Sequence, residues 1–136
     1  MKYLGIDYGT KRIGLAIGDD MTKLALPLTT LTSQSEKDAL AAITRIIMEE
    51  HIGKAVVGKP TTKEGKFRSI TKHAETFCKK LYLHAGIAVV FFDERLTSKA
   101  ADALIRERSQ QGAGRDELAA MVILQNYLDW QLNTGV

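Results

Sequence analysis

The order of strand and helix patterns along the chain constrains its fold more than any other feature of the sequence. Three short segments with strand character come first, at Tyr3–Ile6, Arg12–Asp19 and Leu24–Leu31. The links between them are short and contain glycine or aspartate, which favours an antiparallel meander. Pro27 interrupts the third segment, so we expect that segment at an edge of the sheet.

Helix and strand patterns alternate in the rest of the chain. The expected helices are Glu36–Glu50, Arg68–Ala85, Ser98–Arg108 and Asp116–Gln131, and the expected strands are Lys54–Gly58 and Ile87–Phe92. Strands that alternate with helices are expected to run parallel, with right-handed crossovers. The last strand is apolar throughout, which is typical of a sheet centre covered on both faces. The sequence therefore predicts an α/β fold with a five-stranded mixed sheet. An antiparallel meander of three strands joins two parallel strands, and helices flank the sheet.

One face of the second predicted strand carries only small side chains. Between Ile13 and Gly18, large apolar residues alternate with glycine or alanine. Glycine inside a strand often marks the close approach of another segment. We therefore expect a further element to pack tightly against this face.

The length and composition indicate one domain in a reducing compartment. At 136 residues, the chain is expected to form a single domain over residues 1–136. Its longest unbroken apolar run, Ala85–Phe92, has eight residues, whereas a membrane helix needs about 18 or more. The single cysteine, Cys78, cannot form an internal disulfide. We expect a cytoplasmic protein that does not bind membranes.

Basic residues are concentrated between Lys54 and Lys80. This stretch holds eight lysines and arginines against two glutamates, a local charge of +6 in a chain whose formal net charge is +3. A basic region of this kind fits a polyanionic partner such as nucleic acid. The alternative is a solvated surface with spare lysines.

Acidic residues follow two of the predicted strands and open the last helix. In α/β sheets, ligands bind beyond the carboxyl ends of the strands. Asp7 follows the first strand, Gly58-Lys59-Pro60 the fourth and Asp93-Glu94-Arg95 the fifth, and Asp116 starts the last helix. These positions are expected to meet at one edge of the sheet.

Taken together, Asp7, Glu94 and Asp116 predict a metal centre. Three converging carboxylates hold one or two divalent ions such as Mg²⁺ or Mn²⁺. In a two-metal site, one ion activates water and the other stabilises the leaving oxygen of a phosphodiester. Each acid also has a structural alternative: a turn for Asp7, an ion pair with Arg95 for Glu94, and the helix dipole for Asp116.

Basic residues near these acids are candidates for contacts with substrate phosphates. The candidates are Lys11 and Arg12 beside Asp7, Lys59, Lys63, Lys66 and Arg68 in the basic loop and the helix that follows it, and Arg95 beside Glu94.

Four segments, in this order along the chain, resemble motifs of the YqgF/RuvX family. They are Gly5–Gly14, Val57–Pro60, Asp93–Thr97 and Asp116–Ala120. The first and third motifs are specific to the family, and the second and fourth are looser. Members are RNase H-like, RuvC-related nucleases, and the similarity extends over nearly the whole chain. The resemblance therefore implies an RNase H-like fold for the predicted sheet.

The resemblance also implies roles for individual residues. Asp7, Glu94 and Asp116 would be the catalytic acids and the ligands of Mg²⁺ or Mn²⁺. The substrate would be structured nucleic acid, because the family was named for Holliday-junction resolution and is linked to processing of the 5′ end of precursor 16S ribosomal RNA. Ribosomal particles are further candidate partners, and we expect a monomer or a weak homodimer.

Two positions depart from the family pattern. Ser109–Arg115 contains one basic residue where the family is often rich in lysine and arginine. This departure bears on how the segment binds substrate and on how Asp116 aligns with the family motif. Lys59 stands where the family often has an apolar residue, which would add a phosphate contact.

A metal-dependent endonuclease is the leading hypothesis, and two other functions stay open. The segment from Asp7 to Thr10 resembles the first phosphate loop of sugar kinases and actin-like ATPases. Those proteins enclose a nucleotide between two such lobes, and 136 residues supply one. The second alternative is a nucleic-acid-binding module without catalysis, whose salt-dependent binding would survive Asp7→Asn.

Overall fold

The computed structural model describes residues 1–32, 35–59, 68–93, 103, 106–107, 110, 112 and 114–134. Side chains are described throughout these ranges except at 59, 68–71, 93 and 132–134. The expected helix Ser98–Arg108 therefore lies outside the described residues, apart from three positions within it. The same holds for the polar loop between residues 60 and 67.

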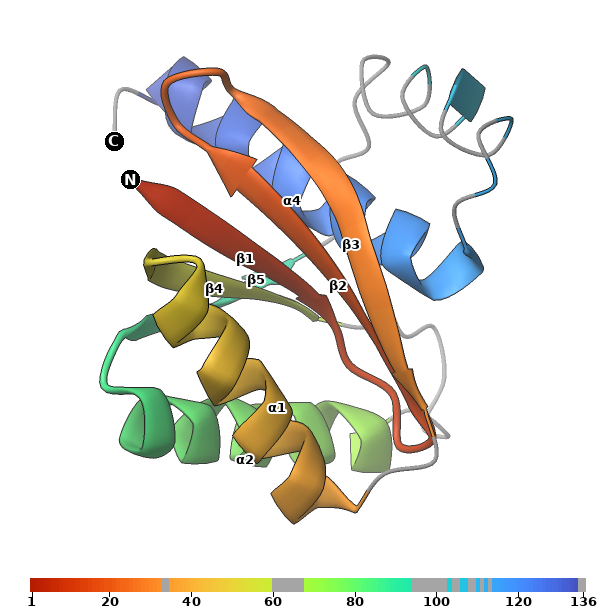
Figure 1. Ribbon diagram of the computed structural model, residues 1–136, viewed down its shortest axis with the longest axis vertical. Coiled ribbons are helices and arrows are strands. Elements are labelled where there is room, and N and C mark those ends of the chain that lie inside the picture. The colour runs from red at the N-terminus through yellow and green to blue at the C-terminus, as the bar shows by residue number, and fades with distance from the viewer. Residues whose placement is uncertain are drawn as a thin grey trace.

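Five strands form one mixed sheet in the order β3-β2-β1-β4-β5 (Figure 1). Their bounds are β1 Lys2–Asp7, β2 Arg12–Asp19, β3 Leu24–Thr32, β4 Ile52–Lys59 and β5 Ala88–Asp93. β2 runs antiparallel to both β1 and β3, whereas β4 runs parallel to both β1 and β5. The predicted meander, the parallel strands and the edge position of β3 are confirmed.

Helices cover both faces of the sheet. α1 Glu36–Glu49 and α2 Arg68–Ala85 pack on one face, and α4 Arg115–Thr134 crosses the other (Figure 1). The Oγ of Ser35 caps α1, as predicted, by accepting a hydrogen bond from the backbone N–H three residues later. None of the helices in the described ranges combines the length and the hydropathy needed to cross a bilayer.

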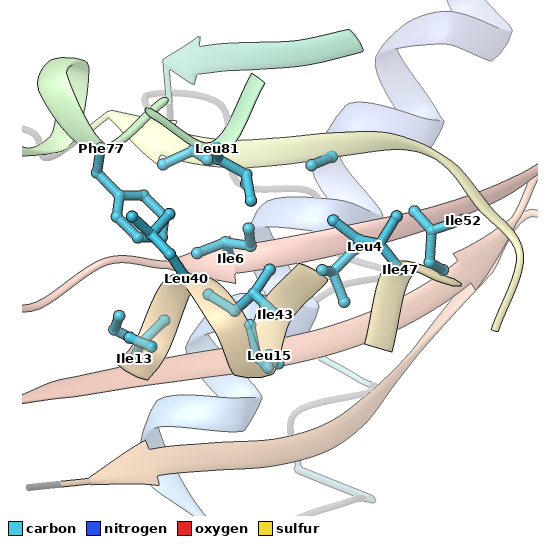
Figure 2. Packing of buried hydrophobic residues seen from close by; sticks show 13 residues of the cluster. Leu4, Ile6, Ile13, Leu15, Leu40, Ile43, Ile47, Ile52, Phe77 and Leu81 are labelled. Carbon is cyan, nitrogen blue, oxygen red and sulfur yellow. The ribbon is translucent and has the colours of Figure 1, made fainter. Parts of the chain in front are cut away.

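The sheet separates the buried side chains into two clusters. The cluster between the sheet and helices α1 and α2 includes Leu4, Ile6, Leu15, Ile43 and Phe77 (Figure 2). The cluster beneath α4 includes Tyr3, Ala16, Val56, Met121 and Leu124. Successive residues of a strand point to opposite faces, so Asp7 shares the α4 face of β1 with Tyr3.

The position of β5 corrects one expectation. Its apolar sequence predicted the centre of the sheet, but β5 is the last of the described strands. Val89 and Phe91 pack against the cluster on the α1 and α2 face, while Val90 and Phe92 pack against the cluster beneath α4. Covering both faces selects apolar residues at every position, whether or not the strand has two neighbours.

Candidate active site

Asp7 ends the middle strand of the sheet. β1 lies between β2 and β4, and Ile6 is paired with Leu15 on one side and with Val57 on the other. The Asp7 side chain is partly buried on the face covered by α4. A carboxylate on a strand with two neighbours is rigidly positioned, as a ligand in an active site needs to be.

The first turn of α4 contacts β2 directly because Gly14 has no side chain. A Cβ atom at Gly14 would collide with the carbonyl oxygen of Asp116. A Cβ atom at Gly5 would lie 2.7 Å from the Cβ of Leu124 and 2.8 Å from the carbonyl oxygen of Ala120. The predicted close approach to the small face of β2 is thus confirmed, and the element that approaches is α4.

The strand register brings Asp7 and Asp116 together from opposite ends of the chain. Asp7 is paired with Gly14 across β1 and β2. Gly14 in turn touches the backbone of Asp116. The two carboxylates are close enough for the charge of Asp116 to raise the pKa of Asp7.

The charged form of Asp7 is disfavoured in this structure. Its pKa is raised from 3.8 to about 6. Burial of the carboxylate is the largest cause and repulsion by Asp116 is the second, while the charge of Arg115 acts in the opposite direction. A cation bound between the two acids would relieve both the desolvation and the repulsion.

Arg12 forms an ion pair with Asp116. Its Nε lies 3.0 Å from the Oδ2 of Asp116. The Arg12 side chain is 60% exposed, whereas that of Asp116 is 25% exposed. Arg12 was expected to contact a substrate phosphate, and in this structure it contacts a carboxylate of the site.

Lys11 lies in a different environment from its neighbour Arg12. Together with Tyr8, Gly9, Thr10 and Glu36 it lines a small cavity of about 40 Å³ between the β1–β2 turn and the start of α1. Such a volume holds roughly one to three water molecules. Burial, together with the nearby charge of Glu36, raises the pKa of Tyr8. An acid on the wall of this cavity disfavours an anion inside it.

The remaining predicted site residues fall where side chains are not described. They are Lys59, Lys63, Lys66, Arg68, Glu94 and Arg95. Within the described ranges, no cluster of three or more histidine, cysteine, aspartate or glutamate side chains forms a metal site. The described part of the candidate site is therefore the Asp7–Asp116 pair with Arg12 and Arg115.

This pair fits a hard divalent cation. Mg²⁺ is usually bound through one or two carboxylates, and water and substrate phosphates complete its coordination. Carboxylate oxygens without sulfur or imidazole favour Mg²⁺ or Mn²⁺ over softer metals. The repulsion of Asp7 by Asp116, which Arg115 offsets only in part, is the feature of this structure that a cation would remove.

Two contributors to the site were not predicted as such. Gly14 was recognised as part of a small face, but not as the point where Asp116 touches the sheet. Arg115 offsets part of the repulsion at Asp7; in the sequence it stands out as the one basic residue of Ser109–Arg115, directly before Asp116. Neither role follows from local pattern, because both depend on where α4 lies.

Comparisons with known proteins agree with this arrangement. Residues 1–130 match the sequence model of the RuvX family, described as a Holliday junction resolvase. A protein of Anaeromyxobacter sp. (strain Fw109-5), named "Putative pre-16S rRNA nuclease", is 38% identical over 133 residues, which cover 95% of this chain and 97% of the relative. A protein of the same name from Chloroflexus aggregans (strain MD-66 / DSM 9485) is 37% identical over 134 residues, with 96% and 94% covered.

Solved structures of resolvases share the fold. Thermus thermophilus RuvC in complex with a Holliday junction substrate superposes with a TM-score of 0.65 at 14% identity, covering 98% of this chain and 97% of that one. The fowlpox virus Holliday junction resolvase gives a TM-score of 0.56 at 14% identity, covering 96% and 99%. At this level of identity the likeness concerns the fold, and the expected RNase H-like architecture is confirmed.

Proposed function

This chain belongs to the RuvX family, and on that premise we propose that it is a divalent-metal-dependent endonuclease that processes precursor 16S ribosomal RNA. The family assignment rests on the match over residues 1–130 and on relatives 37–38% identical over most of the chain. Those relatives are named as nucleases, so the reaction class is hydrolysis of phosphodiester bonds.

The observation that carries the metal-dependent reaction is the juxtaposition of Asp7 and Asp116. A turn-forming role for Asp7 does not call for a second acid beside it, and a helix-dipole role for Asp116 does not call for contact with the sheet. Two carboxylates held together by a tight helix–strand contact repel each other, and the ion pair of Arg12 with Asp116 and the charge of Arg115 still leave the pKa of Asp7 raised. A cation site explains both positions at once.

In the proposed site, each acid is positioned by a different element of the fold. Asp7 would bind the metal from the rigid end of β1, and Asp116 from the first turn of α4. Glu94, the residue that follows β5 in the sequence, is the proposed third ligand. Because β1, β4 and β5 run parallel, β5 ends at the same edge of the sheet as Asp7. When bound, the metal would activate water and stabilise the leaving oxygen of the phosphodiester.

The basic residues near this edge are the proposed grip on the nucleic-acid backbone. Lys59 ends β4, Arg68 begins α2, and Lys63 and Lys66 lie between them in the sequence. We assign the same function to Arg95, next to Glu94, whereas Arg12 contacts Asp116 and Lys11 lines a cavity together with Glu36. Lysine and arginine contacts to phosphates release counterions, so the proposed binding would weaken steeply with salt.

We favour precursor ribosomal RNA as the substrate because the relatives named for it are the more similar to this chain in sequence. The relatives named for pre-16S rRNA are 37–38% identical and covered almost end to end. Holliday junctions enter through the description of the family model and through the RuvC–junction complex, whose likeness at 14% identity concerns the fold. An immature ribosomal particle is then the proposed partner and the bacterial cytoplasm the proposed location. We propose a single-domain monomer over residues 1–136, because cutting one RNA end does not need the two-fold symmetry that a junction would favour.

The test is a cleavage assay with matched variants. Wild type and Asp7→Asn would be incubated with RNA carrying the extended 5′ end of 16S ribosomal RNA, both free and within an immature small-subunit particle. A four-way DNA junction would be offered in parallel. Each reaction would contain Mg²⁺, Mn²⁺ or EDTA. Asp38→Asn, on the exposed surface of α1, is the control for a change of aspartate to asparagine elsewhere.

The expected result is cleavage of the RNA by wild type and by Asp38→Asn with metal, and no cleavage with EDTA or by Asp7→Asn. Cleavage of the junction alone would keep the reaction and replace the substrate. Firm binding without cleavage, unchanged in Asp7→Asn, would indicate a binding module. Equal activity in Asp7→Asn would remove this carboxylate from the site.

A further inference from the structure

We propose that Arg12 is an internal competitor for the cation site, holding the carboxylate of Asp116 while the metal is absent and leaving it when the metal binds. The proposal deepens the proposed function, on which it rests. It assigns to an arginine of this chain the part of a built-in counter-charge that sets how tightly the site takes up a cation.

The first argument is that the two partners differ in freedom to move. Asp116 lies in the first turn of α4, which is fixed against β2 by its backbone contact with Gly14. The Arg12 side chain is 60% exposed and reaches the carboxylate through a contact of 3.0 Å at Nε. When the carboxylate acquires another partner, the guanidinium is therefore the group that moves.

The second argument is the position of Arg12 on β2. Arg12 and Gly14 are two residues apart on this strand, so both face α4. The guanidinium thus approaches Asp116 from the same side of the sheet as Asp7 does. It contacts Oδ2, one of the two oxygens through which Asp116 could bind a cation shared with Asp7.

The third argument is the charge balance of the site. The two carboxylates face two arginines, Arg12 through the ion pair and Arg115 through its effect on Asp7. A divalent cation would bring this balanced group to a surplus of positive charge. The exposed guanidinium of Arg12 is the group that can move into solvent at the lowest cost in free energy.

The test is metal binding by the full-length, metal-free protein, measured by isothermal titration calorimetry with Mn²⁺ at pH 8. Arg12→Gln removes the competitor, and we expect it to bind Mn²⁺ about two- to fivefold more tightly than wild type, as the loss of an exposed ion pair implies. Arg45→Gln makes the same change on the exposed surface of α1, and should bind as wild type does. A merely structural role for Arg12 would weaken binding rather than strengthen it.

A second readout follows the arginine itself. In wild type, the ¹⁵N–¹H resonance of the Arg12 Nε should shift when Mg²⁺ is added, and it should stay in place in Asp7→Asn. Equal or weaker Mn²⁺ binding by Arg12→Gln, or an Nε resonance that does not respond to Mg²⁺, would overturn the competition while leaving the metal site intact. Absence of Mn²⁺ binding by wild type, or equal binding by Asp7→Asn, would instead overturn the proposed function and this inference with it.

Discussion

Gly14 of β2 and Asp116 of α4 touch through their backbones, so closely that a Cβ atom on the glycine would collide with the carbonyl oxygen of the aspartate. Gly14 is also the register partner of Asp7. One position without a side chain therefore sets the separation between the acid on the strand and the acid on the helix. The pair depends on packing between the two ends of the chain.

Gly14→Ala is expected to lower the free energy of unfolding by about 2–3 kcal/mol, because the added methyl group has to displace the backbone of α4. Urea denaturation measures the loss. Gly53→Ala is the matched control: its Cβ would meet the side chain of Met1, which is 60% exposed, and not a backbone atom. The control should stay within about 0.5 kcal/mol of wild type. Equal stability of Gly14→Ala and wild type would contradict the contact.

Asp7→Asn is expected to stabilise the metal-free protein at high pH. The pKa of Asp7 is raised from 3.8 to about 6, so between these values the folded chain binds the proton more tightly than the unfolded chain. Stability therefore falls as the pH rises through this window, and asparagine removes the loss. With allowance for solvent screening, we expect a gain of about 1–2 kcal/mol at pH 8 that vanishes below about pH 4. Urea unfolding in EDTA across this range is the measurement, and a destabilised variant at pH 8 would contradict it.

Metal addition should make wild type more stable than Asp7→Asn. Mg²⁺ or Mn²⁺ at about 100 times its Kd would stabilise wild type by about 2.7 kcal/mol, because the ion binds the folded chain alone. Thermal unfolding with and without metal reports the shift in Tm. Asp7→Asn and Asp116→Asn should lose the response, and Asp38→Asn should keep it. A shift of equal size in Asp7→Asn would place the metal elsewhere.

Glu94→Gln is expected to reduce kcat by at least about 100-fold, since it removes a proposed metal ligand. The neighbouring acid Asp93 provides the comparison, because the family resemblance carries Glu94 and not Asp93 into the triad. Asp93→Asn should remain within a few-fold of wild type. Reversed effects of the two variants in a cleavage assay would shift the third ligand by one position.

The double variant Lys63→Ala/Arg68→Ala is expected to weaken nucleic-acid binding about equally across sequences. Removal of two phosphate contacts should reduce the slope of log K against log salt by about 1.5. Fluorescence anisotropy at several salt concentrations measures both effects. Lys2→Ala/Arg45→Ala removes the same charge far from the carboxyl end of β1 and should leave the slope as in wild type. An unchanged slope in the first variant would remove the basic loop from the interface.

Short sequence patterns were sufficient to predict features that involve only neighbouring residues. The alternation in β2 and the capping residue Ser35 were both recognisable from a few neighbouring residues. The pattern was misleading for β5, because covering both faces of an outer strand produces the same apolar sequence as a central position. The number of neighbouring strands does not change the apolar sequence of such a strand.

The sequence by itself determined the α/β class, the meander of β1 to β3 and the nature of the candidate acids, since hydrophobic period, turn residues and side-chain chemistry are properties of short segments. The meeting of Asp7 and Asp116 was expected from their positions, whereas the tertiary structure alone decided that Gly14 mediates it, that Arg12 pairs with Asp116, and that burial and repulsion together raise the pKa of Asp7. These relationships arise from the register of β1 against β2 and from the packing of α4 against Gly14. Gly14 and Asp116 lie about 100 residues apart in the chain, so no local pattern shows the backbone packing between them.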